Sequence, residues 1–205
     1  MWKTIQIVAR SLFRKRPPWE LPENLSADEY YKLGIDYKLA GWISQSKRAL
    51  RLAIIKEPDG IGKLAAVYLK AYLPKNEISQ EAIRDNIAAV NQSVFDREGA
   101  KQAYLTLIET YPDFEWPYGN LGQLYAGGGS LEEAKSVLNK AIEINPDYVN
   151  GLLHLAFTYS KENNQAEVDR LLERLLAIDP EVKSNVLETY PNLQSRLRDL
   201  KCRSH

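Results

Sequence analysis

Residues 115–148 read EWPYGNLGQLYAGGGSLEEAKSVLNKAIEINPDY, and this stretch predicts a pair of helices. Its first half carries apolar or small residues at offsets of 0, 3, 4 and 7, which lie on one face of an α-helix. These residues are Tyr118, Leu121, Gly122 and Tyr125. The second half carries a second helical stripe, formed by Ala134, Leu138 and Ala141. The glycine run at 127–129 predicts a turn between the two helices, and Pro146 follows the second helix because proline cannot continue it.

The same pattern recurs along the chain at a fixed interval. Pro112, Pro146 and Pro180 stand 34 residues apart, and each follows a run with helical apolar spacing. The stripe of the first helix has counterparts on both sides: Tyr30, Leu33, Gly34 and Tyr37, and Leu152, Leu155, Ala156 and Tyr159. A fixed period of this size predicts an array of helix pairs.

In these residues the chain resembles the tetratricopeptide repeat family, whose 34-residue units share the aromatic, Leu-Gly, Tyr, Ala and Pro pattern. The resemblance implies an all-α fold, a right-handed superhelical solenoid of helix-turn-helix repeats. It is strongest at 115–148 and weakest at 81–114, where Arg84 and Asn91 stand at positions that are aromatic in the family. The implied repeats are 27–60, the degenerate 81–114, 115–148 and 149–182.

Two further elements complete the expected array. Pro58 and Pro112 are 54 residues apart, which is 20 more than one period, and predicts an inserted element at 61–80. Residues 61–73 have the apolar spacing of an amphipathic helix. Residues 183–205 are expected to form a C-terminal capping helix and a basic tail, because a solenoid must cover its last apolar face.

Two helix starts carry the sequence of a capping box. Ser26 with Glu29, and Ser130 with Glu133, each place a hydroxyl residue three positions before a glutamate. In such a box each side chain accepts a hydrogen bond from the other residue's backbone N–H at the start of the helix. We therefore expect helices to begin directly after Ser26 and after Ser130.

The resemblance also implies a concave face, lined by the first helix of each repeat, that holds a peptide. The residues beside the packed stripe predict its lining: Tyr31, Ile35, Lys38, Trp116, Asn120, Gln123, Asn150, Leu153, His154, Phe157 and Lys161. Two alternatives stay open: Leu153 and Phe157 pack against the C-terminal cap or a second copy, and His154 is a helix residue with a satisfied ring. Repeats that clamp acidic chaperone tails have Lys and Asn where this chain has Tyr31 and Ile35, so a neutral or basic segment is the expected ligand.

The N-terminal segment, 1–26, combines a basic amphipathic helix with a proline-rich linker. Five basic residues and no acid lie in residues 1–19. Three interpretations compete for this helix: it docks on the solenoid or a partner, it binds an anionic membrane surface, or it is a transit peptide. The residues expected to make docking or membrane contacts are Trp2, Lys3, Arg10, Phe13, Arg14, Lys15 and Arg16.

The formal net charge is zero, with 27 basic and 27 acidic residues, but the charge is segregated. Residues 1–19 sum to +5 and residues 194–205 to +3, so the body between them carries −8. An acidic body is a poor platform for phosphate, so nucleic-acid binding through the basic ends is the weaker alternative. A membrane-peripheral assembly factor, anchored by the N-terminal helix, is the other alternative.

The chain shows no catalytic or metal-binding motif. Its two histidines, His154 and His205, are far apart, and the chain has neither an HExxH motif nor a second cysteine to pair with Cys202, so neither a zinc site nor a Cys/His dyad has its ligands. We therefore expect no cofactor, no metal and no enzymatic activity. The prediction is a scaffold, adaptor or assembly factor that binds a protein or peptide in the cytoplasm or another reducing compartment, at a membrane periphery in one alternative, and is not secreted.

Overall fold

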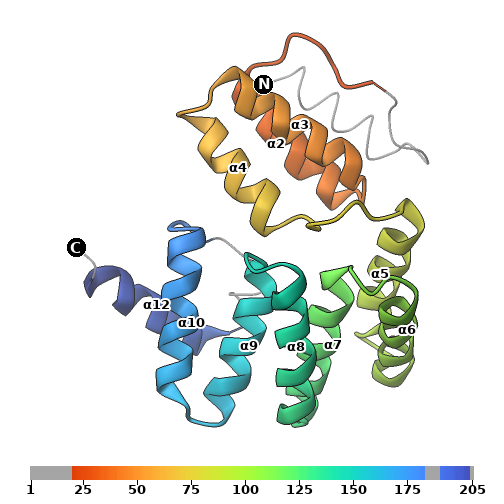
Figure 1. Cartoon of the computed structure of the whole chain (residues 1–205), viewed down its shortest axis with the longest axis vertical. Helices are drawn as coiled ribbons and strands as arrows, with labels where there is room; N and C mark the ends of the chain where they lie inside the picture. The colour runs from red at the N-terminus through yellow and green to blue at the C-terminus, as the bar shows by residue number, and fades with distance from the viewer. Residues whose placement is uncertain (1–19, 183–189, 204–205) are drawn as a thin grey trace. The chain divides into compact units, whose positions relative to one another are not determined.

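The computed structural model of the chain describes residues 20–182 and 190–203, with side chains to residue 202 (Figure 1). These residues form α-helices and turns, and no strand occurs among them. The all-α prediction is therefore confirmed. The helices are α2 (Ala27–Leu39), α3 (Ile43–Lys56), α4 (Ile61–Ala71), α5 (Gln80–Gln92), α6 (Arg97–Thr110), α7 (Glu115–Gly128), α8 (Leu131–Ile144), α9 (Val149–Lys161), α10 (Gln165–Ile178) and α12 (Pro191–Arg203).

The helices belong to two compact units. The first unit is Met1–Leu73 with Glu77–Arg84, and the second is Pro74–Asn76 with Asp85–His205. The first unit therefore contains α2, α3 and α4 and the start of α5. The second unit contains the rest of α5 and the helices from α6 to α12.

The first unit is a helix pair with the inserted helix packed against it. Helices α2 and α3 approach closely at Gly34, where an added Cβ would lie 2.6 Å from Leu50 Cγ. The Ser46 hydroxyl, buried on α3, donates a 2.7 Å hydrogen bond to the Gly34 carbonyl. Helix α4 packs on both α2 and α3, and Tyr68 of α4 meets Tyr31 of α2 edge-to-face at 6.2 Å. The sequence predicted the inserted helix, but only the structure shows that it covers this pair.

The second unit repeats the helix pair as α7 with α8 and α9 with α10. The first helices of the two pairs, α7 and α9, are in contact, and α8 packs against α9 (Figure 1). Gly122 sits against Leu138, which repeats the approach of Gly34 to Leu50 in the first unit. The small residue of the Leu-Gly pattern thus lets the two helices of a pair come together.

Helix α12 closes the second unit through an apolar stripe and one ion pair. Leu193, Leu197 and Leu200 are buried at helical spacing, and α12 packs on α10. The guanidinium of Arg196 forms a bidentate ion pair with Asp169 of α10, with Nε–Oδ1 and Nη2–Oδ2 distances of 2.7 and 2.5 Å. The predicted C-terminal capping helix is therefore confirmed.

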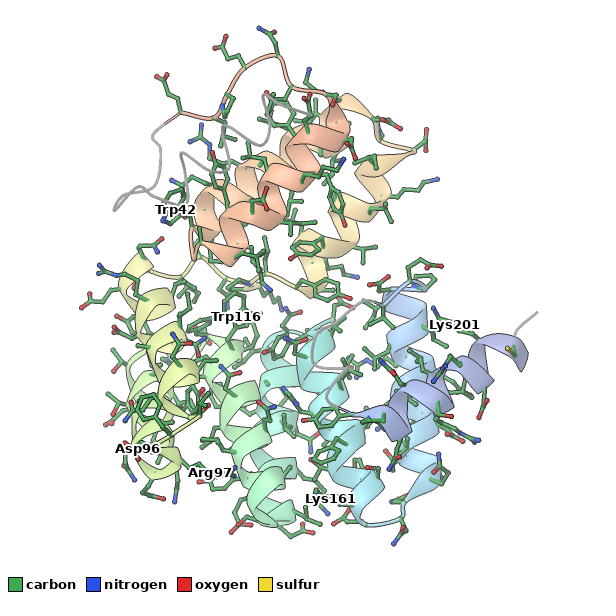
Figure 2. All side chains as sticks on the ribbon, turned by 180° about the vertical axis from the view of Figure 1, so that it is seen from behind. Trp42, Asp96, Arg97, Trp116, Lys161 and Lys201 are labelled. Atoms are coloured by element: carbon green, nitrogen blue, oxygen red, sulfur yellow. The ribbon has the colours of Figure 1, made fainter. Side chains whose placement is uncertain are left out.

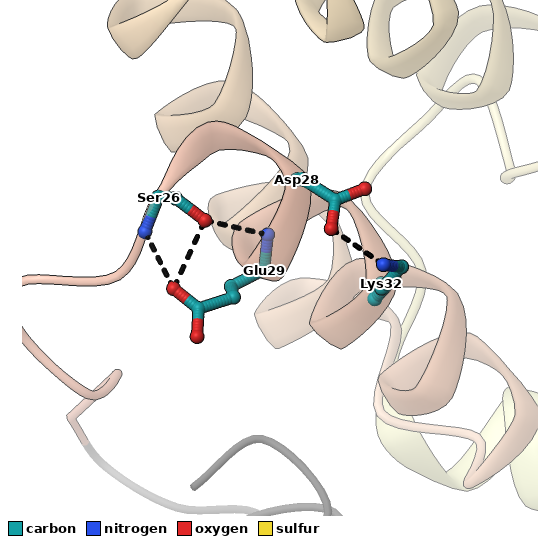
Figure 3. A network of polar contacts seen from close by, with 4 residues as sticks. All are labelled: Ser26, Asp28, Glu29 and Lys32. Carbon is teal, nitrogen blue, oxygen red and sulfur yellow. Dashed lines mark hydrogen bonds and ion pairs between the residues drawn. The ribbon is translucent and has the colours of Figure 1, made fainter. Parts of the chain in front are cut away.

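The capping box of α2 is confirmed in full. The Ser26 hydroxyl oxygen accepts the backbone N–H of Glu29 at 3.3 Å, and Glu29 Oε2 accepts the backbone N–H of Ser26 at 2.8 Å (Figure 3). Near the same helix start, the Lys32 ammonium pairs with the Asp28 carboxylate at 2.5 Å (Figure 3). The two bonds of the capping box satisfy backbone N–H groups that a helix start otherwise leaves without a partner.

The second predicted capping box, at Ser130, is wrong. Ser130 is the N-cap of α8, but its side chain makes no capping hydrogen bond. Its backbone ψ is 71°, whereas that of Ser26 is 167°. The tight turn through Gly129, in the left-handed region at φ 89°, leads the chain into α8 in this different geometry.

The two serines form a matched pair for mutagenesis. We expect Ser26→Ala to lower the free energy of unfolding by about 1 kcal/mol, because it removes a capping hydroxyl. Ser130→Ala should change it by less than about 0.5 kcal/mol, because no capping bond is lost. Urea unfolding followed by circular dichroism measures both values. Equal losses at the two serines would contradict the difference in geometry.

Candidate protein-interaction site

Helix α7 carries three of the predicted lining residues on one stripe, which we call the α7 stripe: Trp116, Asn120 and Gln123. Trp116 is half-buried and lies 5.7 Å from the ring of Phe114, and Figure 2 shows it near the start of α7. It packs against a buried apolar cluster that joins α7 to α8 and the turn after α8, formed by Tyr118, Ala141 and Tyr148. Gln123, two turns further along, is exposed. The stripe thus offers an aromatic side chain and amides from one rigid helix.

The side chain of Asn120 is hydrogen-bonded to a residue 34 positions earlier in the chain. Its side-chain amide donates a 3.0 Å hydrogen bond to Oδ1 of Asn86, a buried residue of α5. Asn86, Asn120 and His154 follow one another at intervals of 34 residues, so the same position on successive first helices is polar. Asn120 and His154 were predicted lining residues and Asn86 was not, although the 34-residue period is sufficient to find it.

Helix α9 carries the second group of predicted lining residues, which we call the α9 stripe: Asn150, Leu153, His154, Phe157 and Lys161. The structure does not leave this stripe open. Leu153 is fully buried and His154 is 2% exposed. Lys161 is exposed at the end of α9, as Figure 2 shows, and its ammonium lies 5.1 Å from the Phe157 ring centroid.

Tyr190, just before α12, covers the α9 stripe. Its hydroxyl is 2.9 Å from Nδ1 of His154, and its ring stacks on Phe157 with centroids 4.1 Å apart and an angle of 14°. Of the alternatives left open, packing against the C-terminal cap therefore describes Phe157, and a satisfied ring describes His154. The expectation that Leu153 and His154 line an open face is corrected, because both are buried in the folded chain.

The remaining lining residues, Tyr31, Ile35 and Lys38, lie on α2 in the first unit. All three are half-buried, and Tyr31 contacts Tyr68 of the inserted helix. Burial lowers the pKa of the Lys38 ammonium. Burial, with smaller contributions from Tyr31 and Asp36, raises the pKa of Tyr68 to about 12. The inserted helix therefore packs against Tyr31, which was predicted to contact a bound peptide.

A buried carboxylate anchors the start of α7 and was overlooked in the sequence. Glu115 is fully buried, and its Oε1 accepts hydrogen bonds of 2.9 Å from the Lys75 backbone N–H and from the Asn145 side chain. The Lys75 ammonium donates a 2.9 Å hydrogen bond to the Ile144 carbonyl oxygen. These contacts tie residues 74–76 to the ends of α7 and α8. They fix the position of the neighbouring Trp116 backbone.

The N-terminal candidates, Trp2, Lys3, Arg10, Phe13, Arg14, Lys15 and Arg16, lie outside the described residues. In the described part of the chain, no three His, Cys, Asp or Glu side chains gather as a metal site would require. None of the helices that the structure describes has the length and apolar character needed to cross a bilayer.

Comparison with known proteins agrees with this geometry. A model of the tetratricopeptide repeat family matches residues 117–148, which span α7 from its third residue, α8 and the turn after α8. The TPR2AB domain of yeast Sti1, solved as a complex with pHSP90, is similar with a TM-score of 0.50 and 17% identity, over 84% of this chain and 68% of that chain. The helix pairs, their packing and this match define a helical-repeat protein.

Residues 117–148 are thus similar to a tetratricopeptide repeat, within a chain that has the helical-repeat fold of such proteins. MamA from Desulfovibrio magneticus RS-1, from residue 41 to its end, is also similar in structure, with a TM-score of 0.45 and 16% identity over 89% of this chain and 97% of that chain. A thermophilic tetratricopeptide repeat protein of Thermus thermophilus has a TM-score of 0.44 and 19% identity, over 87% and 83% of the two chains. No curated protein sequence matches the chain significantly.

Proposed function

We propose that the chain is a non-catalytic interaction scaffold, an adaptor or assembly factor, whose α7 stripe binds a partner polypeptide. The observation that carries this proposal is the α7 stripe itself, with an exposed amide at Gln123 and a half-buried ring at Trp116. These side chains stand on a helix that is fixed at its start by the buried Glu115 and along its length by α8. A rigid, pre-positioned surface binds a peptide at a lower entropic cost than a mobile one does.

The chemistry of the stripe suits a polypeptide ligand. Tryptophan dominates many protein interfaces because it buries a large area with few rotatable bonds. Amide side chains, such as those of Asn120 and Gln123, both donate and accept hydrogen bonds, which matches the peptide backbone. The complex of the Sti1 domain with pHSP90 supports a protein ligand for this fold. The acidic body of the chain favours a neutral or basic segment over an acidic tail.

The test places the same charge on the two helices of one repeat. Gln123→Arg puts a bulky cation on the α7 stripe, whereas Asn139→Arg puts it on α8, where Asn139 is also exposed. We expect Gln123→Arg to reduce capture of the partner from a cell extract at least about tenfold, a loss of roughly 1.4 kcal/mol. The control Asn139→Arg should capture as much as the wild type. Quantitative mass spectrometry of the captured proteins measures the ratio.

Both substituted positions are exposed, so both variants should unfold at wild-type urea concentrations, and this is checked first. Equal capture by Gln123→Arg and Asn139→Arg would show that the α7 stripe is not the binding surface. A crosslinking side chain at position 123 gives an independent readout, because it labels a partner only if the partner lies on α7.

A further inference from the structure

Tyr190 occupies a side-chain site on the α9 stripe. Its side chain is buried, at 7% exposure, between two residues of α9 that stand one turn apart. Phe157 supplies a flat ring at 4.1 Å, and His154 supplies a nitrogen at 2.9 Å from the phenol oxygen. The same His154 ring meets the Tyr190 ring edge-on at 5.9 Å. The phenol of Tyr190 is thus contacted by the aromatic ring of Phe157 and by the imidazole nitrogen of His154.

The helix that follows Tyr190 has its own anchors. Leu193, Leu197 and Leu200 are buried, and Arg196 holds Asp169 of α10. These contacts are made by residues of α12 itself. Helix α12 is therefore attached to α10 by side chains other than that of Tyr190.

We propose that His154 and Phe157 form a tyrosine-binding subsite of the partner surface, in which Tyr190 is an intrachain occupant that a tyrosine of the bound polypeptide replaces. This inference rests on the proposed function, because it extends the surface from the α7 stripe to the α9 stripe. The two stripes stand on helices that contact each other. Their positions also repeat at the 34-residue period, so a ligand that follows α7 reaches α9 next.

Each contact of the subsite selects one property of the incoming side chain. Stacking on Phe157 selects an aromatic ring, because offset or parallel rings gain more than their buried area alone provides. The bond to His154 selects a hydroxyl, because phenylalanine would leave the buried imidazole nitrogen without this partner. Sites that hydrogen-bond a ligand hydroxyl discriminate strongly against analogues that lack it. The subsite therefore prefers tyrosine to phenylalanine, and both to alanine.

A peptide taken from the chain itself provides the probe. The fluorescein-labelled peptide VLETYPN, residues 186–192, is titrated against the full-length wild type and against Tyr190→Ala, with fluorescence anisotropy as the readout. We expect the Tyr190→Ala protein, whose subsite is vacated, to bind the peptide at least about tenfold more tightly than the wild type does. The peptide with phenylalanine at its tyrosine should bind several-fold more weakly, and the peptide with alanine should not bind.

A second measurement separates binding from folding. The tyrosine side-chain analogue 4-methylphenol should raise the melting temperature of Tyr190→Ala and leave that of the wild type unchanged. It should also leave the double variant Tyr190→Ala, Phe157→Ala unchanged, because the stacking partner is gone. If Tyr190→Ala is too unstable for the peptide titration, this rescue alone decides the question.

The inference is overturned if wild type and Tyr190→Ala bind the peptide equally, or if 4-methylphenol does not stabilise the variant selectively. Neither result depends on capturing a natural partner. The Gln123→Arg experiment tests the proposed function separately, so failure of the tyrosine subsite and failure of the α7 stripe are distinguishable.

Discussion

Gly122→Ala will lower the free energy of unfolding by about 1–3 kcal/mol, although alanine is the better helix former. The reason is the distance between α7 and α8. A Cβ on residue 122 would lie 2.4 Å from Leu138 Cγ and 2.6 Å from its Cδ2. Rotation of the leucine about χ2 does not move Cγ, so that rotation alone does not remove the clash. The two helices must separate or the side chain must leave its rotamer.

Gly127, in the last turns of the same helix, is the matched control. A Cβ there would meet only an arginine side chain, with Arg97 Nη2 at 3.4 Å. Gly127→Ala should therefore leave stability unchanged or raise it by up to about 1 kcal/mol, because the backbone loses less entropy on folding. Urea unfolding of the two variants separates the packing cost from the helix propensity that they share.

A double-mutant cycle checks the assignment to Leu138. Leu138→Ala alone removes a fully buried side chain and should cost about 2–5 kcal/mol. With Gly122→Ala added, the total loss should be clearly smaller than the sum of the two single losses, because the new methyl then occupies space that leucine vacated. Additive losses would show that the close approach at Gly122 does not limit packing.

Acid will destabilise the chain through His154 in the range between pH 6.5 and about 3. Burial lowers the pKa of His154 from 6.5 to about 3 in the folded state. Above pH 6.5 the ring is neutral in both states and contributes nothing. Below pH 6.5 the unfolded chain binds a proton that the folded chain does not, so the free energy of unfolding falls by up to about 1.4 kcal/mol for each pH unit. At pH 5 the loss amounts to about 2 kcal/mol.

His154→Gln isolates this contribution from the carboxyl groups that also titrate in acid. Glutamine keeps a polar side chain but has no proton to gain, so the difference in stability between wild type and variant should shrink or reverse as the pH falls from 7 to 4. Urea unfolding at a series of pH values gives the difference curve. A curve that is flat over this range would mean that His154 is accessible to solvent in the folded chain. Tyr190→Ala, which uncovers the ring, should flatten the curve in this way.

The helix pairs were predictable because their information is local. The offsets of Tyr118, Leu121, Gly122 and Tyr125 specify one face of one helix, and the 34-residue period repeats that specification along the chain. The inserted helix followed from the same period, because a 54-residue interval between two prolines leaves room for one more element. The capping box at Ser26 was also predictable, since its two hydrogen bonds join residues only three positions apart in the sequence.

The failures of prediction concern backbone geometry and contacts between distant segments. Ser130 has the right neighbours in sequence and follows a glycine turn, but its hydroxyl makes no capping hydrogen bond. Glu115 is bonded by Lys75, 40 residues earlier, and no helical period describes that contact. His154 was a candidate lining residue, with a satisfied helix residue as the open alternative, and the contact that decides between them comes from Tyr190, 36 residues later in the chain.

The amino-acid pattern alone therefore specified an all-helical repeat array, the faces of each helix that pack, and the stripes that remain on the first helices. Which of those stripes stays accessible was decided by tertiary structure. Hydrophobic periodicity distinguishes the packed face of a helix from its other faces, but it carries no information about which later segment will cover an aromatic residue on those faces. The α7 stripe keeps an exposed side chain at Gln123, whereas the α9 stripe is covered because the ring of Tyr190 stacks on Phe157.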